Sequence, residues 1–146
     1  MDVPVSYAFN SSAEIHDSKT RPFMRYVSVA ETQSSTPLQD FNLSSTWVSA
    51  AAPPLFASDW SAVCYFSGRG VYDAMGGTVP VGLFKAAVGG TTIQSWLPMD
   101  AIHLCTPTPK GNSNNSCHYN AMLAPLQLGP AVFSSLIWYQ VRSSYL

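Results

Sequence analysis

The glycine pair in Gly89-Gly90-Thr91-Thr92 is the position along this chain where residue type and spacing best suit chemistry. Glycine tolerates a positive φ angle and leaves its backbone N–H group uncovered by a side chain. Where such a turn leads from a strand into a helix, these N–H groups can stabilise a developing oxyanion. A plain tight turn would have the same residues, so the spacing alone leaves both interpretations open.

The remaining side chains that could act as nucleophile or base are not arranged in a catalytic pattern. No G-x-S-x-G elbow occurs in the chain. Ser113 stands between a glycine and asparagines, but in a polar loop that cannot hold a nucleophile rigidly. One Asp-x-x-His spacing occurs, from Asp100 to His103, but no histidine stands at a metal-ligand spacing. We expect surface or loop positions for His16, His103 and His118. We therefore predict neither a metal nor a cofactor.

The cysteines leave the redox state of the protein open. Cys105 and Cys117 flank a stretch rich in proline, glycine, asparagine and serine, and a disulfide between them would close a loop in an oxidising compartment. Free buried thiols are the alternative, and the third cysteine, Cys64, has no obvious partner.

Three sequons, which begin at Asn10, Asn42 and Asn114, favour a secreted or lysosomal (lumenal) product. Residues 1–4 contain neither a basic n-region nor an apolar h-region, so we predict no signal peptide within this chain. The two observations point in different directions, and the compartment stays an expectation drawn from the sequons.

Length and composition restrict the class of protein. The chain has 146 residues, of which 47% are hydrophobic, enough for the core of one domain. Only 10% are charged, the net charge is -1, and no cluster of lysines and arginines exists to bind a phosphate backbone. Apolar runs such as residues 79–88 are far shorter than the roughly 20 residues of a membrane span. We therefore expect neither a nucleic-acid partner nor a membrane span.

The hydrophobic pattern predicts alternating strands and helices. We expect strands at residues 23–30, 79–87 and 133–139, a helix from Ser58 to Met75, a helical turn at 92–96 and a short helix at 119–126. Residues 1–22 and 31–57 should be mainly loop. This order predicts an α/β protein with a parallel sheet covered by helices on both faces. The chemistry of such sheets lies beyond the carboxyl ends of the strands, where Gly89-Gly90 and Gln140 fall.

Five blocks, in order, resemble the sialate O-acetylesterase family. They are Trp60 to Arg69, Val81-Gly82-Leu83, Val88 to Thr91 with Trp96, Tyr119 to Leu126, and Ile137-Trp138-Tyr139-Gln140. Each block alone would be ordinary, but their order over residues 23–140 makes the match specific. The resemblance implies an SGNH-hydrolase fold, which is a flavodoxin-like, three-layer α/β/α sandwich. It also implies hydrolysis of O-acetyl esters on sialic acids or related sugars by a serine nucleophile, without a metal.

The resemblance further implies that residues 1–146 form a single, partial domain. The family's nucleophile lies in a Gly-Gln-Ser-Asn-Met block, and Met1 resembles the last residue of that block. The segment expected to bring the Asp and His of the family's acid–base system is also absent after Gln140. We therefore expect this chain to be inactive alone. The alternative function is that of a truncated, non-catalytic homologue that binds acetylated glycans.

Residue by residue, the resemblance assigns roles to one small set of positions. Gly89 and Gly90 resemble the glycine block that lends a backbone N–H to the oxyanion, and Gln140 resembles the polar residue at the same hole. Trp138 and Tyr139 are candidates for the wall of the acyl or sugar pocket, or for core positions at a strand end. The partner implied is an O-acetylated carbohydrate.

Overall fold

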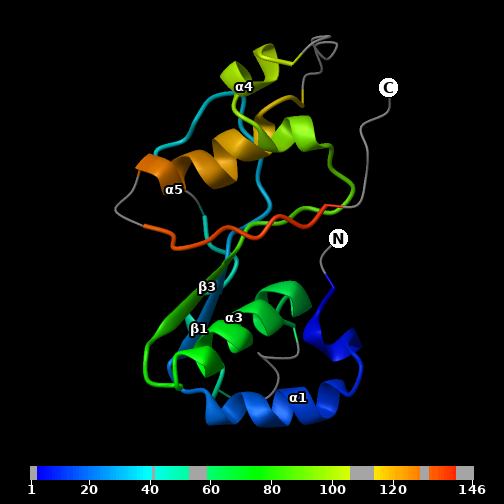
Figure 1. The fold of residues 1–146 in the computed structure, drawn as a ribbon. Helices are drawn as coiled ribbons and strands as arrows, with labels where there is room; N and C mark the ends of the chain where they lie inside the picture. The colour runs from blue at the N-terminus through cyan, green and yellow to red at the C-terminus, as the bar shows by residue number, and fades with distance from the viewer. Residues whose placement is uncertain (1–2, 41, 53–58, 106–113, 129–131, 141–146) are drawn as a thin grey trace. The chain divides into compact units, whose positions relative to one another are not determined.

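The computed structural model describes residues 3–40, 42–52, 59–105, 114–128 and 132–140 (Figure 1). The chain forms two compact units, each built from segments distant in sequence. We call residues 2–29 and 43–87 the sheet unit, and residues 30–42 and 88–146 the helical unit. None of the described helices is both long and apolar enough to cross a membrane.

The sheet unit contains a three-stranded sheet with the order β2-β1-β3. The strands β1 (Met24–Ser28) and β3 (Val81–Lys85) pair in parallel over their whole length, and the two-residue strand β2 (Val48–Ser49) pairs antiparallel with β1. Both longer strands lie inside the predicted segments, residues 23–30 and 79–87. A parallel strand pair joined through a helix confirms the α/β class.

The helix α3 (Ala62–Ala74) connects β1 and β3 in the manner of a parallel crossover. Its first turn is capped by Ser61, whose hydroxyl accepts a hydrogen bond from the N–H of Cys64. The predicted cap, Ser58, lies outside the described residues, and the helix begins later than expected. The predicted end is confirmed, because Gly76 and Gly77 have φ angles of 70° and 68°, which glycine adopts without strain.

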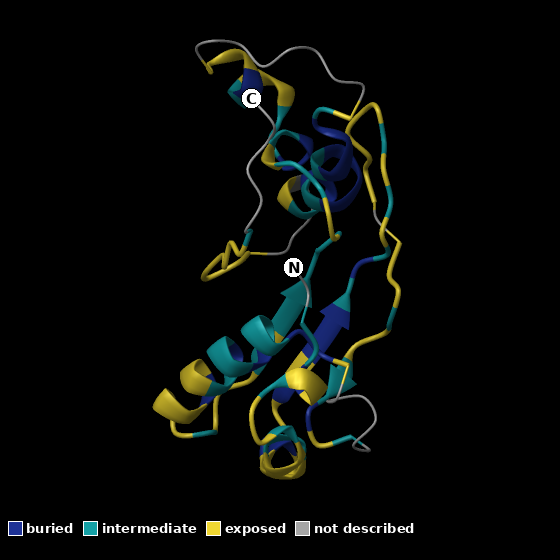
Figure 2. Cartoon of the chain, turned by 90° about the vertical axis from the view of Figure 1, so that its right-hand side faces the viewer, coloured by how far each residue is buried: buried dark blue, intermediate teal, exposed yellow. Residues whose placement is uncertain are grey.

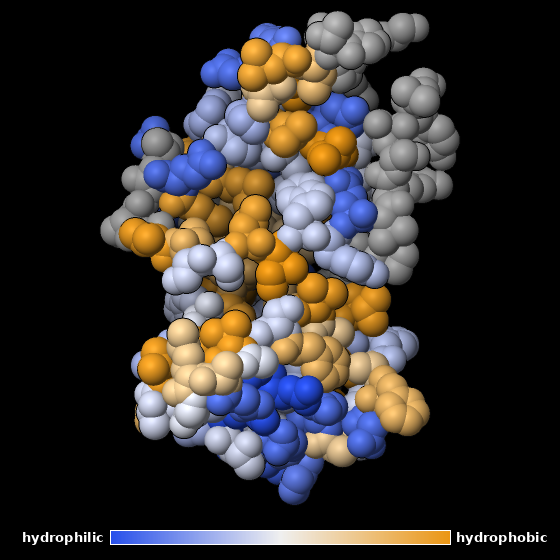
Figure 3. All heavy atoms as spheres, viewed as in Figure 1, coloured by the Kyte–Doolittle hydropathy of each residue, from blue (hydrophilic) through white to orange (hydrophobic). Residues whose placement is uncertain are grey.

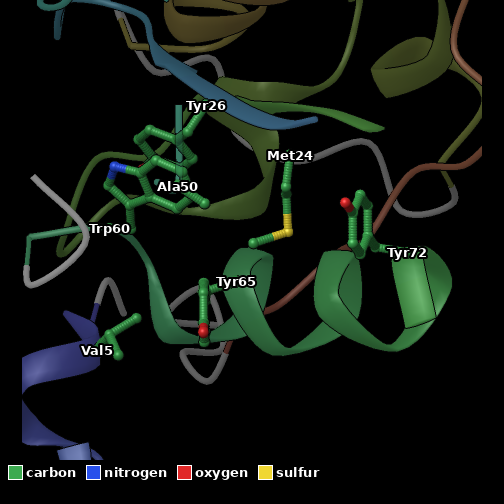
Figure 4. Close-up of a cluster of buried hydrophobic side chains, with 7 residues drawn as sticks. All are labelled: Val5, Met24, Tyr26, Ala50, Trp60, Tyr65 and Tyr72. Atoms are coloured by element: carbon green, nitrogen blue, oxygen red, sulfur yellow. The ribbon is translucent and has the colours of Figure 1, made fainter. Parts of the chain in front are cut away.

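The core of the sheet unit lies between α3 and one face of the sheet (Figure 4). Alternate residues of β1, Met24 and Tyr26, are buried against the helix, as the two-residue period of a strand requires. The ring of Tyr26 stacks on Trp60 with centroids 4.8 Å apart. The buried cluster comprises Val5, Met24, Tyr26, Ala50, Trp60, Tyr65 and Tyr72. Of the expected three layers, the described part of this unit contains the sheet and the helix layer on one face.

The amino-terminal segment of the sheet unit is more helical than predicted. In place of a loop with a single turn, it forms η1 (Val5–Tyr7), α1 (Ser11–Asp17) and η2 (Ser18–Thr20). Its polar residues give no apolar periodicity, and the helix is held by contacts with α3 that are distant in sequence. Glu14 pairs with Arg69, and the backbone carbonyl of Glu14 accepts a hydrogen bond from the hydroxyl of Tyr65.

Arg21 is the second link between this segment and α3. Its side chain is 11% exposed and donates two hydrogen bonds of 3.0 Å to the carboxylate of Asp73. A third bond of 2.5 Å goes to the carboxylate of Asp17. The hydrogen bonds from Arg21 hold the pKa of Asp73 below its ordinary value of 3.8. The guanidinium thus fixes the end of α1 against the last turn of α3.

The helical unit contains the short helices η3 (Ile93–Trp96), α4 (Met99–His103), η4 (Tyr119–Leu123) and α5 (Ala124–Leu128). The predicted turn at residues 92–96 is confirmed. The helix predicted at 119–126 is present as a π-helical turn, η4, that continues into α5, and its buried residues are dark in Figure 2. The sequence pattern missed α4.

The strand predicted at residues 133–139 is wrong. Residues 132–140 have no strand assignment, and their large apolar side chains are exposed, from 47% at Trp138 to 94% at Val132. Apolar residues are likewise visible at the surface in Figure 3. The segment has the composition of a strand, but a strand exists only where a neighbouring backbone pairs with it, and none of the described residues does so.

Gly68 permits the close approach of α3 to the sheet, and replacing it tests this packing. A Cβ at Gly68 would lie 2.5 Å from Cδ2 of Leu83, whereas a Cβ at Gly70, on the same helix, would meet nothing within 4 Å. We expect Gly68→Val to lower the free energy of unfolding by about 1–3 kcal/mol through overpacking. Gly70→Val should be neutral or slightly stabilising. Urea unfolding of both variants checks this, and equal stability would contradict it.

Arg21→Met tests the link between α1 and α3, because methionine keeps the apolar stem and removes every hydrogen bond of the guanidinium, including the three to the carboxylates of Asp73 and Asp17. We expect a loss of about 1–3 kcal/mol at pH 6, which is modest because both aspartates are half exposed. The depressed pKa of Asp73 stabilises the fold above pH 3.8, and this contribution is lost as the pH falls through the folded-state value. The gap between wild type and Arg21→Met should therefore narrow between pH 6 and pH 3. Arg25→Met, at an exposed position, is the control.

Candidate oxyanion site

The glycine corner predicted from the sequence is present as an exposed turn in the helical unit. Gly90 has a φ angle of 76°, a conformation that only glycine adopts without strain, and Gly89 precedes it at the surface. The hydroxyl of Thr91 donates to the carbonyl of Val88 at 2.9 Å, which closes the turn across the two glycines. Among the described residues, neither glycine N–H has a hydrogen-bond acceptor. Within the described part of the chain, both donors therefore face no competing acceptor.

Gln140, which is 50 positions after Gly90 in the chain, is brought to this corner by a hydrogen bond. Its side-chain Nε2 donates to the backbone carbonyl of Thr91 at 3.0 Å. A primary amide has two N–H groups, so one of them remains for a ligand. The corner and Gln140, predicted as parts of one site, are thus adjacent through Thr91. Backbone and amide donors fixed around one point are what stabilisation of an oxyanion requires.

Trp96 connects this site to the interior of the helical unit. Its indole Nε1–H donates to Oγ1 of Thr91 at 2.8 Å, and the residue is only 7% exposed. The ring of Trp138 meets it edge-on with centroids 6.3 Å apart. Of the two predicted pocket residues, Trp138 therefore contacts Trp96, the residue that bonds to the glycine corner. Tyr139 is 54% exposed.

His118 is buried, which corrects the expectation of a surface or loop histidine. Its ring stacks on Trp96 with centroids 5.0 Å apart and an interplanar angle of 16°. The ring nitrogens face Nε2 of Gln33 at 3.3 Å and Sγ of Cys117 at 3.4 Å. Burial lowers the pKa of His118, against a smaller raising effect of Glu31, so the ring is neutral at neutral pH.

The predicted cysteine pair consists of free thiols in this structure. Cys105 is exposed just after α4, whereas Cys117 is 5% exposed beside His118. Burial raises the pKa of the Cys117 thiol, so this sulfur is protonated and unreactive at neutral pH.

The described residues do not contain a nucleophile and base in contact. None of the three histidines, within the described ranges, has a ring nitrogen in hydrogen-bond contact with a serine hydroxyl or a carboxylate. Ser113, the serine considered from the sequence, lies outside the described residues. No group of three metal-ligating side chains is found in the described part of the chain. The described residues thus bring hydrogen-bond donors together at the glycine corner, without a nucleophile and base beside them.

Sequence reasoning missed the contacts that support the corner, which involve Thr91, Trp96 and His118. Thr91 and Trp96 both stand in one block that resembles the esterases, but nothing in that block indicated that they bond to each other. His118 follows Trp96 by 22 residues, and no local pattern relates the two.

The relatives found by sequence comparison share one name, sialate O-acetylesterase. The chain is 27% identical to a sialate O-acetylesterase of Pongo abelii and to one of Homo sapiens, in each case over 99% of this chain and 29% of the relative. A sialate O-acetylesterase of Rattus norvegicus is 32% identical over 72% of this chain and 20% of the relative. No family model matches the chain.

The fold leads to the same group of proteins. The crystal structure of a carbohydrate acetylesterase from Xanthomonas citri superimposes with a TM-score of 0.70 at 25% identity, over 87% of this chain and 27% of that one. The chain spans 29% of the length of the first two relatives, and so corresponds to a part of them. By sequence and by fold, this chain belongs to the sialate O-acetylesterase family.

Proposed function

We propose that this chain contributes the oxyanion site of a carbohydrate O-acetylesterase that cleaves acetyl esters on sugars by a serine-esterase mechanism. The observation that carries the proposal is the contact between Thr91 and Gln140, which brings a side-chain amide beside the glycine corner. In this mechanism a serine attacks the acetyl carbonyl, and the carbonyl oxygen becomes negatively charged. The N–H groups of Gly89 and Gly90 and the free N–H of Gln140 would bind that oxygen.

The substrate that we propose is an O-acetylated carbohydrate, a sialic acid or a related sugar. Its support is the names of the relatives, sialate O-acetylesterases in two primates and a carbohydrate acetylesterase in the structural neighbour. Trp138 would offer the sugar an apolar surface next to the corner, because it is 47% exposed and packs on Trp96. Secretion or lumenal location stays a prediction; the three sequon asparagines, Asn10, Asn42 and Asn114, are exposed.

A second candidate function is binding of acetylated glycans without catalysis. It is favoured by the described residues themselves, which contain donors for an ester carbonyl but no histidine in contact with a serine hydroxyl. Both functions use the same site and differ in whether a nucleophile and a base complete it.

We predict that the 146-residue chain alone hydrolyses p-nitrophenyl acetate no faster than its heat-denatured control. Loss of the nucleophile or the base removes several orders of magnitude of rate and leaves only the small contribution of the oxyanion site. A serine-reactive phosphonate tests the reason as well as the rate. Stoichiometric labelling of one serine in the folded chain would contradict the prediction.

Coding DNA next to the chain separates the two functions. The esterase function predicts that a Gly-Gln-Ser-Asn run is encoded immediately upstream of Met1. It also predicts that a Gly-Glu run is encoded downstream of the codon for Gln140, which Val141 follows in this chain. The longer product should then release acetate from O-acetylated sialic acid. If neither run is encoded, the catalytic proposal fails, and a glycan array carrying acetylated and deacetylated sugars tests the binding function.

A further inference from the structure

Thr91 is the point at which the two halves of the candidate oxyanion site meet. Its carbonyl accepts the hydrogen bond from Gln140, and its hydroxyl closes the turn at Val88. The same hydroxyl oxygen accepts the indole N–H of Trp96 at 2.8 Å. A hydroxyl has one donor and two acceptor positions, so it can make both bonds at once.

The glycine corner has no other support of this kind among the described residues. Gly89 and Gly90 are exposed, and a Cβ at either position would meet nothing within 4 Å, so the turn is not held by close packing on that side. Glycine also has the largest conformational freedom of any residue. A turn with these properties samples many conformations unless hydrogen bonds at its ends restrict it, whereas an oxyanion site works only when its donors are fixed beforehand.

The indole of Trp96, by contrast, is held firmly. His118 stacks on its face, Trp138 covers its edge, and the residue is buried. His118 is itself placed by contacts of both ring nitrogens, with Gln33 and Cys117. These contacts fix the orientation of the ring, so its N–H points in one direction, toward the hydroxyl oxygen of Thr91.

We infer that Trp96 is a positioning residue for the oxyanion site: through Thr91 it holds the glycine corner and the amide of Gln140 in one geometry. The inference rests on the proposed function only in so far as it calls this site an oxyanion site. The positioning itself is a property of the folded chain and is measurable without catalysis. His118 acts one step further away, as the surface against which the indole is stacked.

The test follows the side-chain amide of Gln140 by NMR in the uniformly 15N-labelled 146-residue chain. Hydrogen exchange of this amide should be slower than that of a free glutamine. Trp96→Phe keeps an aromatic ring to stack on His118 and removes the indole N–H, together with part of the ring. Loss of one hydrogen bond corresponds to roughly a three- to tenfold change in an opening equilibrium, so we expect the protection of the Gln140 amide to fall by about that factor.

Matched variants separate positioning from a general loss of structure. Thr91→Val, which removes the hydroxyl but keeps the shape, should lose at least as much protection as Trp96→Phe, because it also breaks the bond to Val88. Thr91→Ser should restore the protection. The double variant Thr91→Val/Trp96→Phe should lose no more protection than Thr91→Val alone, because the link to Trp96 is already broken in that variant. Trp47→Phe, a half-exposed tryptophan of the sheet unit, should change nothing at Gln140. The backbone amide of Asn120, bonded to Ser116 at 2.8 Å, should keep its protection in every variant.

Two results would overturn the inference. One is unchanged protection of the Gln140 amide in Trp96→Phe, together with a folded spectrum. The other is additive losses in the double variant, which would mean that Trp96 and Thr91 act independently. If Trp96→Phe does not fold, the comparison of Thr91→Val with Thr91→Ser decides the question. Absence of esterase activity in any variant bears on the proposed function and leaves the positioning result unaffected.

Discussion

The geometry of the candidate site depends on Thr91, because both of its polar groups accept hydrogen bonds from residues outside the glycine corner. Its carbonyl holds the amide of Gln140, and its hydroxyl oxygen receives the indole N–H of Trp96. Two exposed glycines cannot fix their own N–H groups in space. The buried aromatic residues supply the missing rigidity, and the threonine transmits it. The glycine N–H donors of the candidate site are therefore exposed, whereas Trp96 and His118, which hold them in place, are buried. Preorganised charge stabilisation needs donors that are fixed in this way.

The sheet unit has a core of its own, and its packing depends on how closely α3 can approach the strands. The parallel pair of strands and α3 can approach closely only because Gly68 faces Leu83 without a side chain. The amino-terminal segment is then fixed to the same helix by two arginines, Arg21 through Asp73 and Arg69 through Glu14. These links cross more than 50 residues of sequence. A polar segment can thus be helical where its own residues would not predict a helix.

The parts of this molecule that were predictable are those whose cause is local. The strands at 24–28 and 81–85 follow from runs of apolar residues, and the end of α3 follows from Gly76-Gly77. The contact of Gln140 with the glycine corner was expected from the family resemblance and from the predicted strand ends, although the strand predicted before Gln140 is wrong. The segment 133–139 has the composition of a strand, but none of the described residues pairs with it, and His118 is buried with its ring stacked on Trp96. Pairing and stacking across such distances are decided by the fold and leave no local pattern.

The central claim is that Gly89, Gly90 and the amide of Gln140 bind one oxyanion. Titration of the 15N-labelled chain with sodium acetate tests it most directly, because the acetate carboxylate presents a charged oxygen on an acetyl group, as the reaction does. We predict saturable NMR shifts of the two glycine N–H groups and of the Gln140 side-chain amide, with one common dissociation constant and no response to sodium chloride at equal ionic strength. Shifts that do not saturate, or that leave these three groups unchanged, would contradict the claim.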